Sequence, residues 1–116
     1  MVISHKFDLL RLSTQELLAR RGKLAGRLGD VERVLTGSLV EQMRRCGKAG
    51  CRCAYGDPHG PYAYFTPRHG VRGMRYVPAT LVASVLAFLR NGEHVEAVLA
   101  EISAINVELL ARRALS

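Results

Sequence analysis

The chain has 116 residues, of which 48% are hydrophobic and 23% are charged, a composition typical of a folded domain and not of a disordered chain. No apolar run approaches the about 18 residues that a transmembrane helix needs, and residues 1–7 lack the charged and apolar regions of a secretory signal. We therefore expect a cytoplasmic protein without a membrane partner. We expect residues 1–116 to form a single domain with helical parts at 1–36 and 79–116 around a Cys-rich loop and small sheet at 37–78.

The first long helix is expected to begin at Ser13. Ser13 and Glu16 have the spacing of a capping box, in which each side chain binds the backbone N–H of the other residue. An apolar stripe with heptad spacing follows, formed by Leu17, Leu24, Leu28, Val31 and Leu35, and Leu10 lies one heptad upstream. Gly22 and Gly26 each cost about 1 kcal/mol of helix propensity relative to alanine. The helix must therefore rely on packing, and residues 36–38 are expected to end it.

Between the helical parts, the pattern changes to the alternation that is typical of strands. Residues 39–45 can be extended. Residues 61–66 and 73–78 predict an antiparallel pair that is joined by a turn at residues 69–73. The middle of the chain thus predicts a small antiparallel sheet.

Two helices are expected in the last third of the chain. The first opens at Pro78 and stops at Asn91 and Gly92, and the second runs from Glu93 to about Arg113. The apolar residues of the second helix alternate three and four apart: Val95, Val98, Ile102, Ile105 and Leu109. With the first long helix they predict a helical hairpin or bundle within an α+β fold. Packing within one chain and a four-helix bundle from two chains both stay open, because so small a chain buries only about two-thirds of its surface.

The three cysteines fall within eight residues, in the run Cys-Gly-Lys-Ala-Gly-Cys-Arg-Cys. Zinc prefers four tetrahedral sulfur or nitrogen ligands. The expected metal ligands are Cys46, Cys51, Cys53 and His59. Gly47 and Gly50 allow the backbone to turn tightly around a metal, and the basic neighbours favour the thiolate form that metals require. The run therefore predicts a structural zinc site.

Other interpretations of the cysteines stay open, because the spacing differs from the paired C-x2-C knuckles of standard zinc sites. A thiol trio among cations can be a redox sensor, and reduced thiols can be incidental. His69 is a rival fourth ligand, whereas His5 and His94 fall in helical parts, where a solvated histidine is the ordinary interpretation. An enzyme has little support, since the chain has no phosphate-binding loop, paired-carboxylate motif or nucleophile elbow. Asp57 is the sole candidate general base near the cysteines.

The same region resembles a known family. Residues 44–48, 51–53 and 59–64 read Arg-Arg-Cys-Gly-Lys, Cys-Arg-Cys and His-Gly-Pro-Tyr-Ala-Tyr, and residues 75–78 read Arg-Tyr-Val-Pro. They resemble the CGKxxCxC, HGPYxY and RYVP-like motifs of an uncharacterised family of small bacterial and archaeal proteins. The resemblance covers about residues 37–78 and, loosely, the last helix. It implies an accessory protein of mobile elements that binds a metal and nucleic acid, with the cysteines and His59 acting as one unit.

The formal net charge of +7 arises from the middle of the chain. Residues 42–92 hold eight basic residues, one acidic residue and all four tyrosines. Basic side chains neutralise phosphates, and tyrosines that share a strand face can stack on bases. The expected nucleic-acid-binding residues are Arg44, Arg45, Lys48, Arg52, Tyr62, Tyr64, Arg68, Arg72 and Arg75. The sequence therefore predicts a small, basic, zinc-stabilised protein that binds nucleic acid, with DNA favoured over RNA.

Two further functions stay open. The tyrosines can pack on the helices while the arginines form a solvated face. The chain would then be a protein–protein assembly module whose heptad-like helices bind a partner, including a second copy, and whose metal loop is purely structural. The third hypothesis is a thiol redox regulator, in which oxidation changes the oligomeric state.

Overall fold

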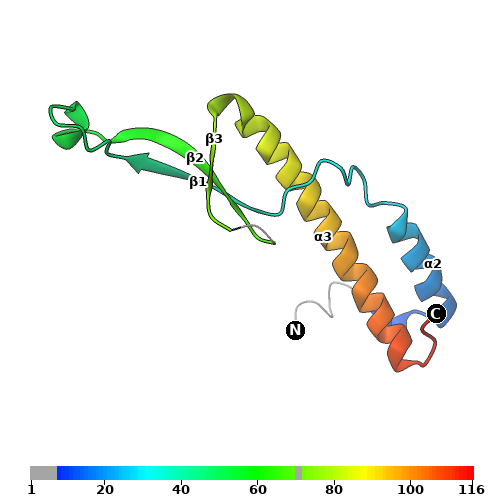
Figure 1. Cartoon of the computed structure of the whole chain (residues 1–116). Coiled ribbons are helices and arrows are strands. Elements are labelled where there is room, and N and C mark those ends of the chain that lie inside the picture. Colours follow the sequence, from blue (N-terminus) through cyan, green and yellow to red (C-terminus); the bar gives the residue numbers. More distant parts are fainter. Residues whose placement is uncertain (1–7, 70–71) are drawn as a thin grey trace. The chain divides into compact units, whose positions relative to one another are not determined.

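The structure is a computed structural model, which describes residues 8–69 and 72–116. The elements in chain order are η1 (Leu9–Arg11), α2 (Thr14–Ala25), β1 (Gly37–Arg44), η2 (Arg52–Ala54), β2 (His59–Pro67), β3 (Arg75–Val77), η3 (Ala79–Leu81) and α3 (Val82–Ala111) (Figure 1). The α+β class is confirmed. Residues 1–7, which include His5 and the region examined for a secretory signal, lie outside the described residues. So do residues 70 and 71 of the expected turn.

The chain forms two compact units. The helical unit comprises Met1–Glu32 and Glu93–Ser116, and the sheet unit comprises Arg33–Gly92. The helical unit holds α2 and the C-terminal part of α3, whereas the sheet unit holds the strands and the cysteines. Within residues 8–69 and 72–116, no helix combines the length and the hydropathy that crossing a bilayer requires.

The helical unit is built around an apolar core between α2 and α3. Its buried residues are Leu9, Leu17, Leu24, Val98, Ile105 and Leu109. The capping box at the start of α2 is confirmed, since Ser13 Oγ accepts from the N–H of Glu16 at 3.1 Å and Glu16 Oε1 accepts from the N–H of Ser13 at 2.9 Å. An Arg20–Glu101 ion pair also links the two helices.

The expected C-terminal end of the first long helix is wrong, because α2 ends at Ala25 and not near Leu35. Gly26 follows as the C-cap residue, and the low helix propensity of glycine favours an end there. The apolar stripe is divided between two cores beyond this point. Leu28 packs against the core of the helical unit, whereas Leu35 packs against the core of the sheet unit.

The two expected C-terminal helices are one continuous helix, α3, after the short turn η3 (Figure 1). Asn91 and Gly92 do not end this helix; both contact the backbone of the segment before β1 instead. Asn91 Nδ2 donates to the carbonyl of Arg33 at 2.8 Å. A Cβ atom at position 92 would lie only 2.1 Å from the carbonyl oxygen of Leu35, so glycine is needed there to admit the neighbouring backbone.

The three strands form an antiparallel sheet in the order β1-β2-β3, which confirms the expected strand pairing. The strand β3 is shorter than the expected segment 73–78. On one face, Ala63, Phe65 and Val77 are buried, and partly buried apolar residues of the sheet unit pack against them. Those residues are Leu35, Leu39, Val82, Val85 and Leu89. The opposite face carries the tyrosines of β2, as the alternation predicted.

Candidate metal centre

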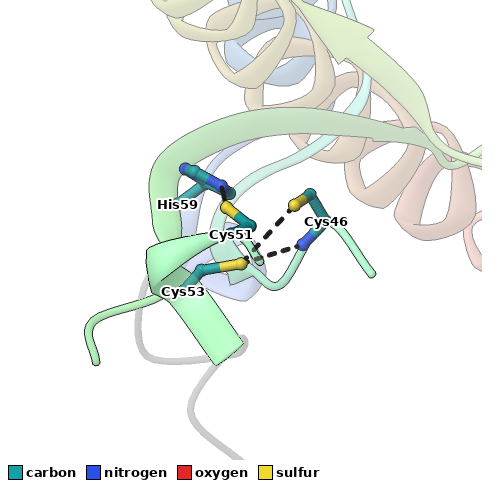
Figure 2. Close-up of side chains that lie close together, drawn as sticks. All are labelled: Cys46, Cys51, Cys53 and His59. Atoms are coloured by element: carbon teal, nitrogen blue, oxygen red, sulfur yellow. Dashed lines mark hydrogen bonds between the residues drawn. The ribbon is translucent and has the colours of Figure 1, made fainter. Parts of the chain in front are cut away.

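The connection between β1 and β2, residues 45–58, contains all three cysteines, and we call it the Cys loop. The structure brings the expected ligands together at this loop and the start of β2. Their ligand atoms all lie within 4.8 Å of one another, and Figure 2 shows the four side chains converging on one point. They are Cys46, Cys51, Cys53 and His59. The expected clustering is confirmed, and the set could hold a metal ion.

Local backbone geometry explains how one short loop gathers three thiols. Gly47 and Gly50 have φ angles of 76° and 79°, a conformation that is costly for residues with a Cβ atom. These two turns fold the chain back on itself between Cys46 and Cys51. The N–H of Cys46 then donates to Cys53 Sγ at 3.3 Å, the type of backbone contact that orients a sulfur ligand.

Two of the distances within the cluster are near those expected around a tetrahedral ion. Sulfur ligands at about 2.3 Å from zinc lie about 3.8 Å apart in a tetrahedron, and a sulfur–nitrogen pair lies slightly closer. The Cys46 and Cys53 sulfurs are 3.6 Å apart, and Cys51 Sγ lies 3.2 Å from His59 Nε2. Three thiols and one imidazole form a donor set that zinc uses in closed structural sites. The residues therefore fit a zinc ion by chemistry, and their ligand atoms, all within 4.8 Å of one another, lie near enough to share one ion.

The thiols differ in how readily they ionise. The backbone N–H of Lys48, with further hydrogen bonds from Cys51 and His59, lowers the pKa of Cys46 to about 6. At Cys51 the backbone N–H of Cys53 favours the thiolate, but the neighbouring Cys46 and Cys53 thiols outweigh it and raise the pKa. The Cys46 thiolate is thus favoured at neutral pH, whereas ionisation of the Cys51 thiol is disfavoured. A bound metal ion would favour ionisation of Cys51 as well, because a cation stabilises neighbouring thiolates.

The other candidate histidines lie elsewhere. His69 is exposed beyond the end of β2 and does not belong to the metal-competent cluster found among the described residues. The structure therefore favours His59 as the fourth ligand. His94 is exposed on α3, and its Nε2 lies 2.7 Å from the carbonyl oxygen of Arg27.

The cations predicted to bind nucleic acid fall into two groups. One group lies at or beside the Cys loop: Arg44, Arg45, Lys48 and Arg52. All four side chains are exposed. Arg45 Nη1 also donates to the carbonyl of Gly56 at 3.0 Å, which links the two ends of the Cys loop. This group therefore lies in the same segment of the chain as the candidate metal ligands.

The second group lies near the opposite end of β2 and consists of Arg68, Arg72 and Arg75. The register pairs Arg75 with Phe65, so Arg75 shares the face of the buried residues and not that of the tyrosines. Its Nη1 donates to the carbonyl oxygens of Arg72 and Gly73, at 2.9 and 3.4 Å. The structure therefore does not bring all seven cations into one patch.

Tyr62 and Tyr64 share a half-buried face of β2, and sequence reasoning omitted their neighbour Tyr76 from the candidate residues. Tyr76 pairs with Tyr64 across the strands, and its ring contacts both tyrosine rings of β2. The predicted pairing of residues 61–66 with 73–78, together with strand alternation, could have placed it there. Tyr55, in the Cys loop, was also omitted, although its side chain is 89% exposed.

Comparison with known proteins gives one match, to an uncharacterised family. No curated protein and no solved structure matches the chain. The family match spans residues 14–87, so it includes α2 in addition to the segment 37–78 on which the resemblance was first noted. It contains the whole Cys loop and all three strands. The chain belongs to the family defined by the domain of unknown function DUF6788.

Proposed function

We propose that the protein is a small nucleic-acid-binding accessory protein whose Cys loop is held by one structural zinc ion, and that DNA is its preferred partner. The observation that carries this proposal is the position of the metal-competent cluster. The three thiols and His59 converge, and the same short segment of chain carries four exposed cations, Arg44, Arg45, Lys48 and Arg52.

Zinc is favoured over other metals by the ligand chemistry. Thiolates and imidazole select zinc or iron–sulfur chemistry, whereas calcium and magnesium require oxygen ligands. A closed set of four protein ligands leaves no open position for a substrate, and this is typical of a structural zinc site. When bound, the ion would replace the apolar core that the Cys loop lacks, and the loop would hold its cations in fixed positions.

Nucleic acid is favoured as the partner by the charge of the same region. Only Asp57 offsets the basic residues between positions 42 and 92. Lys48 and Arg52 are exposed, and both lie between or beside metal ligands in the chain. Fixed cations that face phosphates release counterions on binding, so affinity falls as salt rises.

A salt series tests the electrostatic part of the proposal. Fluorescence anisotropy with labelled DNA should show an affinity loss of about 100-fold between 50 and 200 mM salt if four cations contact phosphates. Lys48→Ala and Arg52→Ala should each reduce the salt slope by about one. Arg90→Ala, which removes an exposed cation from α3, is the matched control and should leave the slope unchanged. A flat salt series would refute the proposal.

A homodimer formed through the helices is a second candidate, favoured by one observation. Leu99, Val107 and Leu110 are exposed on α3, although they lie in the same helix as the buried core residues. An apolar stripe of this kind can pair with its copy in a second chain. Sedimentation of wild type and Leu110→Glu tests this directly. A dimer that the charged variant dissociates supports the candidate, and a wild-type monomer excludes it.

A further inference from the structure

The face of the sheet opposite its buried residues carries a cluster of aromatic rings. We call it the tyrosine face and define it as Tyr62, Tyr64, Tyr76 and Arg44. Because the apolar residues of the sheet unit pack on the other face, this one stays accessible. Tyr76 is 57% exposed, and Val40, which the register places opposite Tyr64, is 41% exposed.

The rings of the tyrosine face are held in place without covering one another. Tyr76 meets Tyr62 and Tyr64 edge to face, with interplanar angles of 70° and 65°. Neither pair is stacked in parallel, so Tyr62 and Tyr76 keep ring surface available for a ligand, whereas Arg44 covers one side of the Tyr64 ring. The Arg44 guanidinium lies 4.8 Å from the centre of the Tyr64 ring. This contact adds a cation that can meet a phosphate beside a stacked base.

The spacing of the rings favours unpaired bases over a duplex. The ring centres are 6.3 and 5.9 Å apart, which is well beyond the about 3.4 Å between successive bases in a stacked strand. Bases that stack on neighbouring rings must therefore have left their own stack. Unpaired strands allow this at low cost, whereas a duplex hides its base faces inside the helix.

The cations at the two ends of β2 fit a strand that crosses the tyrosine face. The Cys loop, which carries Arg45, Lys48 and Arg52, leads into the start of β2, and Arg68 follows Pro67 at its end. At about 3.3 Å per residue, the nine residues of β2 span roughly 27 Å. That length corresponds to roughly eight nucleotides of a stacked strand, and to fewer when the strand is extended.

We infer that the tyrosine face binds unpaired bases, so that the preferred partner of the protein is a single-stranded nucleic acid with its sugar–phosphate chain held by the cations at both ends of β2. This inference rests on the proposed nucleic-acid binding and specifies its substrate. It also adds Tyr76, which the sequence prediction omitted, as a base-stacking residue.

The first test compares a single strand with its duplex. The probes are a labelled 15-nucleotide DNA of mixed sequence, the same strand annealed to its complement, and an RNA of the same sequence. The zinc-loaded protein should bind the DNA or RNA single strand at least about tenfold more tightly than the duplex. The two single-stranded probes distinguish DNA from RNA, and tighter binding of either one than of the duplex supports the inference.

Substitutions of the tyrosines test whether base stacking on their rings produces the preference for single strands over the duplex. Tyr76→Ile keeps an apolar, strand-favouring side chain but removes the ring, and it should weaken single-strand binding by about 5- to 150-fold. Tyr76→Phe keeps the ring and should bind as wild type does. Tyr62→Ile repeats the test on the longer strand. An unchanged circular dichroism spectrum and zinc content would show that each variant folds.

Tyrosine emission gives a direct reading of the contact, because the chain contains no tryptophan and four tyrosines. In Tyr55→Ile protein, every remaining tyrosine lies on the tyrosine face. Addition of the single strand should quench this emission, since direct contact with a stacked base deactivates the excited ring. The Tyr55→Ile substitution itself, made in the Cys loop, should leave the preference for single strands unchanged.

The possible failures are distinguishable. Binding of the duplex as tightly as the single strand, or an unchanged affinity in Tyr76→Ile and Tyr62→Ile, would overturn this inference and leave the electrostatic proposal standing. If no probe binds at 50 mM salt, the proposed function itself fails, and the inference fails with it.

Discussion

In the helical unit the side chains of Leu17, Ile105 and Leu109 are completely buried, whereas in the Cys loop Cys53 is the single buried residue among positions 45–58. The first region is stabilised by apolar surface removed from water. The second has almost no such surface, and its thiols and imidazole converge on one point instead. The comparison shows that one short chain contains a region with a well-buried apolar core and a region with almost none, whose clustered thiols could hold a metal ion instead.

Removal of the metal with a chelator should have the largest effect on stability, and the loss of structure should be confined to the Cys loop. Structural zinc contributes about 10–16 kcal/mol of apparent binding free energy in small zinc-dependent folds, and this loop has no core to replace it. Hydrogen exchange followed by mass spectrometry should show lost protection at residues 45–58 and unchanged protection in α2. Equal loss in both regions would show that they are not stabilised independently.

Leu17→Ala is the complementary experiment, because it perturbs the apolar core of the helical unit and leaves the Cys loop intact. Truncation of a completely buried leucine should lower the free energy of unfolding by about 2–5 kcal/mol, measured by urea denaturation of the zinc-loaded protein. The zinc content should stay that of wild type. Leu10→Ala is the matched control, because Leu10 is 77% exposed, and it should change stability by only about 0.5 kcal/mol.

Two glycine substitutions should have effects of opposite sign. Gly92→Ala places a Cβ atom against the Leu35 carbonyl and should destabilise the protein by about 1–3 kcal/mol. Gly22→Ala, in α2, meets nothing within 4 Å and should stabilise it by up to about 1 kcal/mol through helix propensity. Thermal denaturation of both variants checks this. Stabilisation by Gly92→Ala would contradict the close approach of Leu35 to α3.

The smallest effect is expected from pH at the capping box. Hydrogen bonds from the backbone and hydroxyl of Ser13 lower the pKa of Glu16 below its ordinary value of 4.5. The ionised carboxylate therefore stabilises α2 above pH 4.5, and this contribution is lost as the pH falls through the lowered folded-state pKa. In thermal denaturation, Glu16→Gln should be less stable than wild type at pH 6, and the difference should vanish at pH 2. A constant difference across this range would rule out this contribution.

The sequence allowed much of the sheet unit to be predicted, because its signals are local. Strand alternation placed Phe65 and Tyr64 on opposite faces without saying which face is buried, and the glycines of the Cys loop indicated its turns. The four ligands were predicted from residue type and clustering in the chain. The predicted pairing of residues 61–66 with 73–78 could have brought Tyr76 near the other tyrosines, but its place directly opposite Tyr64 depends on the exact register, which alternation alone does not fix.

The helix boundaries were harder to predict, because distant contacts decide them. The heptad pattern continues to Leu35, but Leu35 packs against the core of the sheet unit, so the helix ends earlier. Asn91 and Gly92 resemble a helix end in the sequence. Their actual partners are Arg33 and Leu35, which lie more than fifty positions away and leave no local signal at residues 91 and 92.

The most direct test of the account is the zinc content of the native, fully reduced protein, measured by mass spectrometry and repeated on Cys51→Ser. The account predicts about one zinc ion per chain in wild type and its loss in the variant. Less than about half an equivalent in reduced wild type, or equal content in both proteins, would contradict a zinc-held Cys loop.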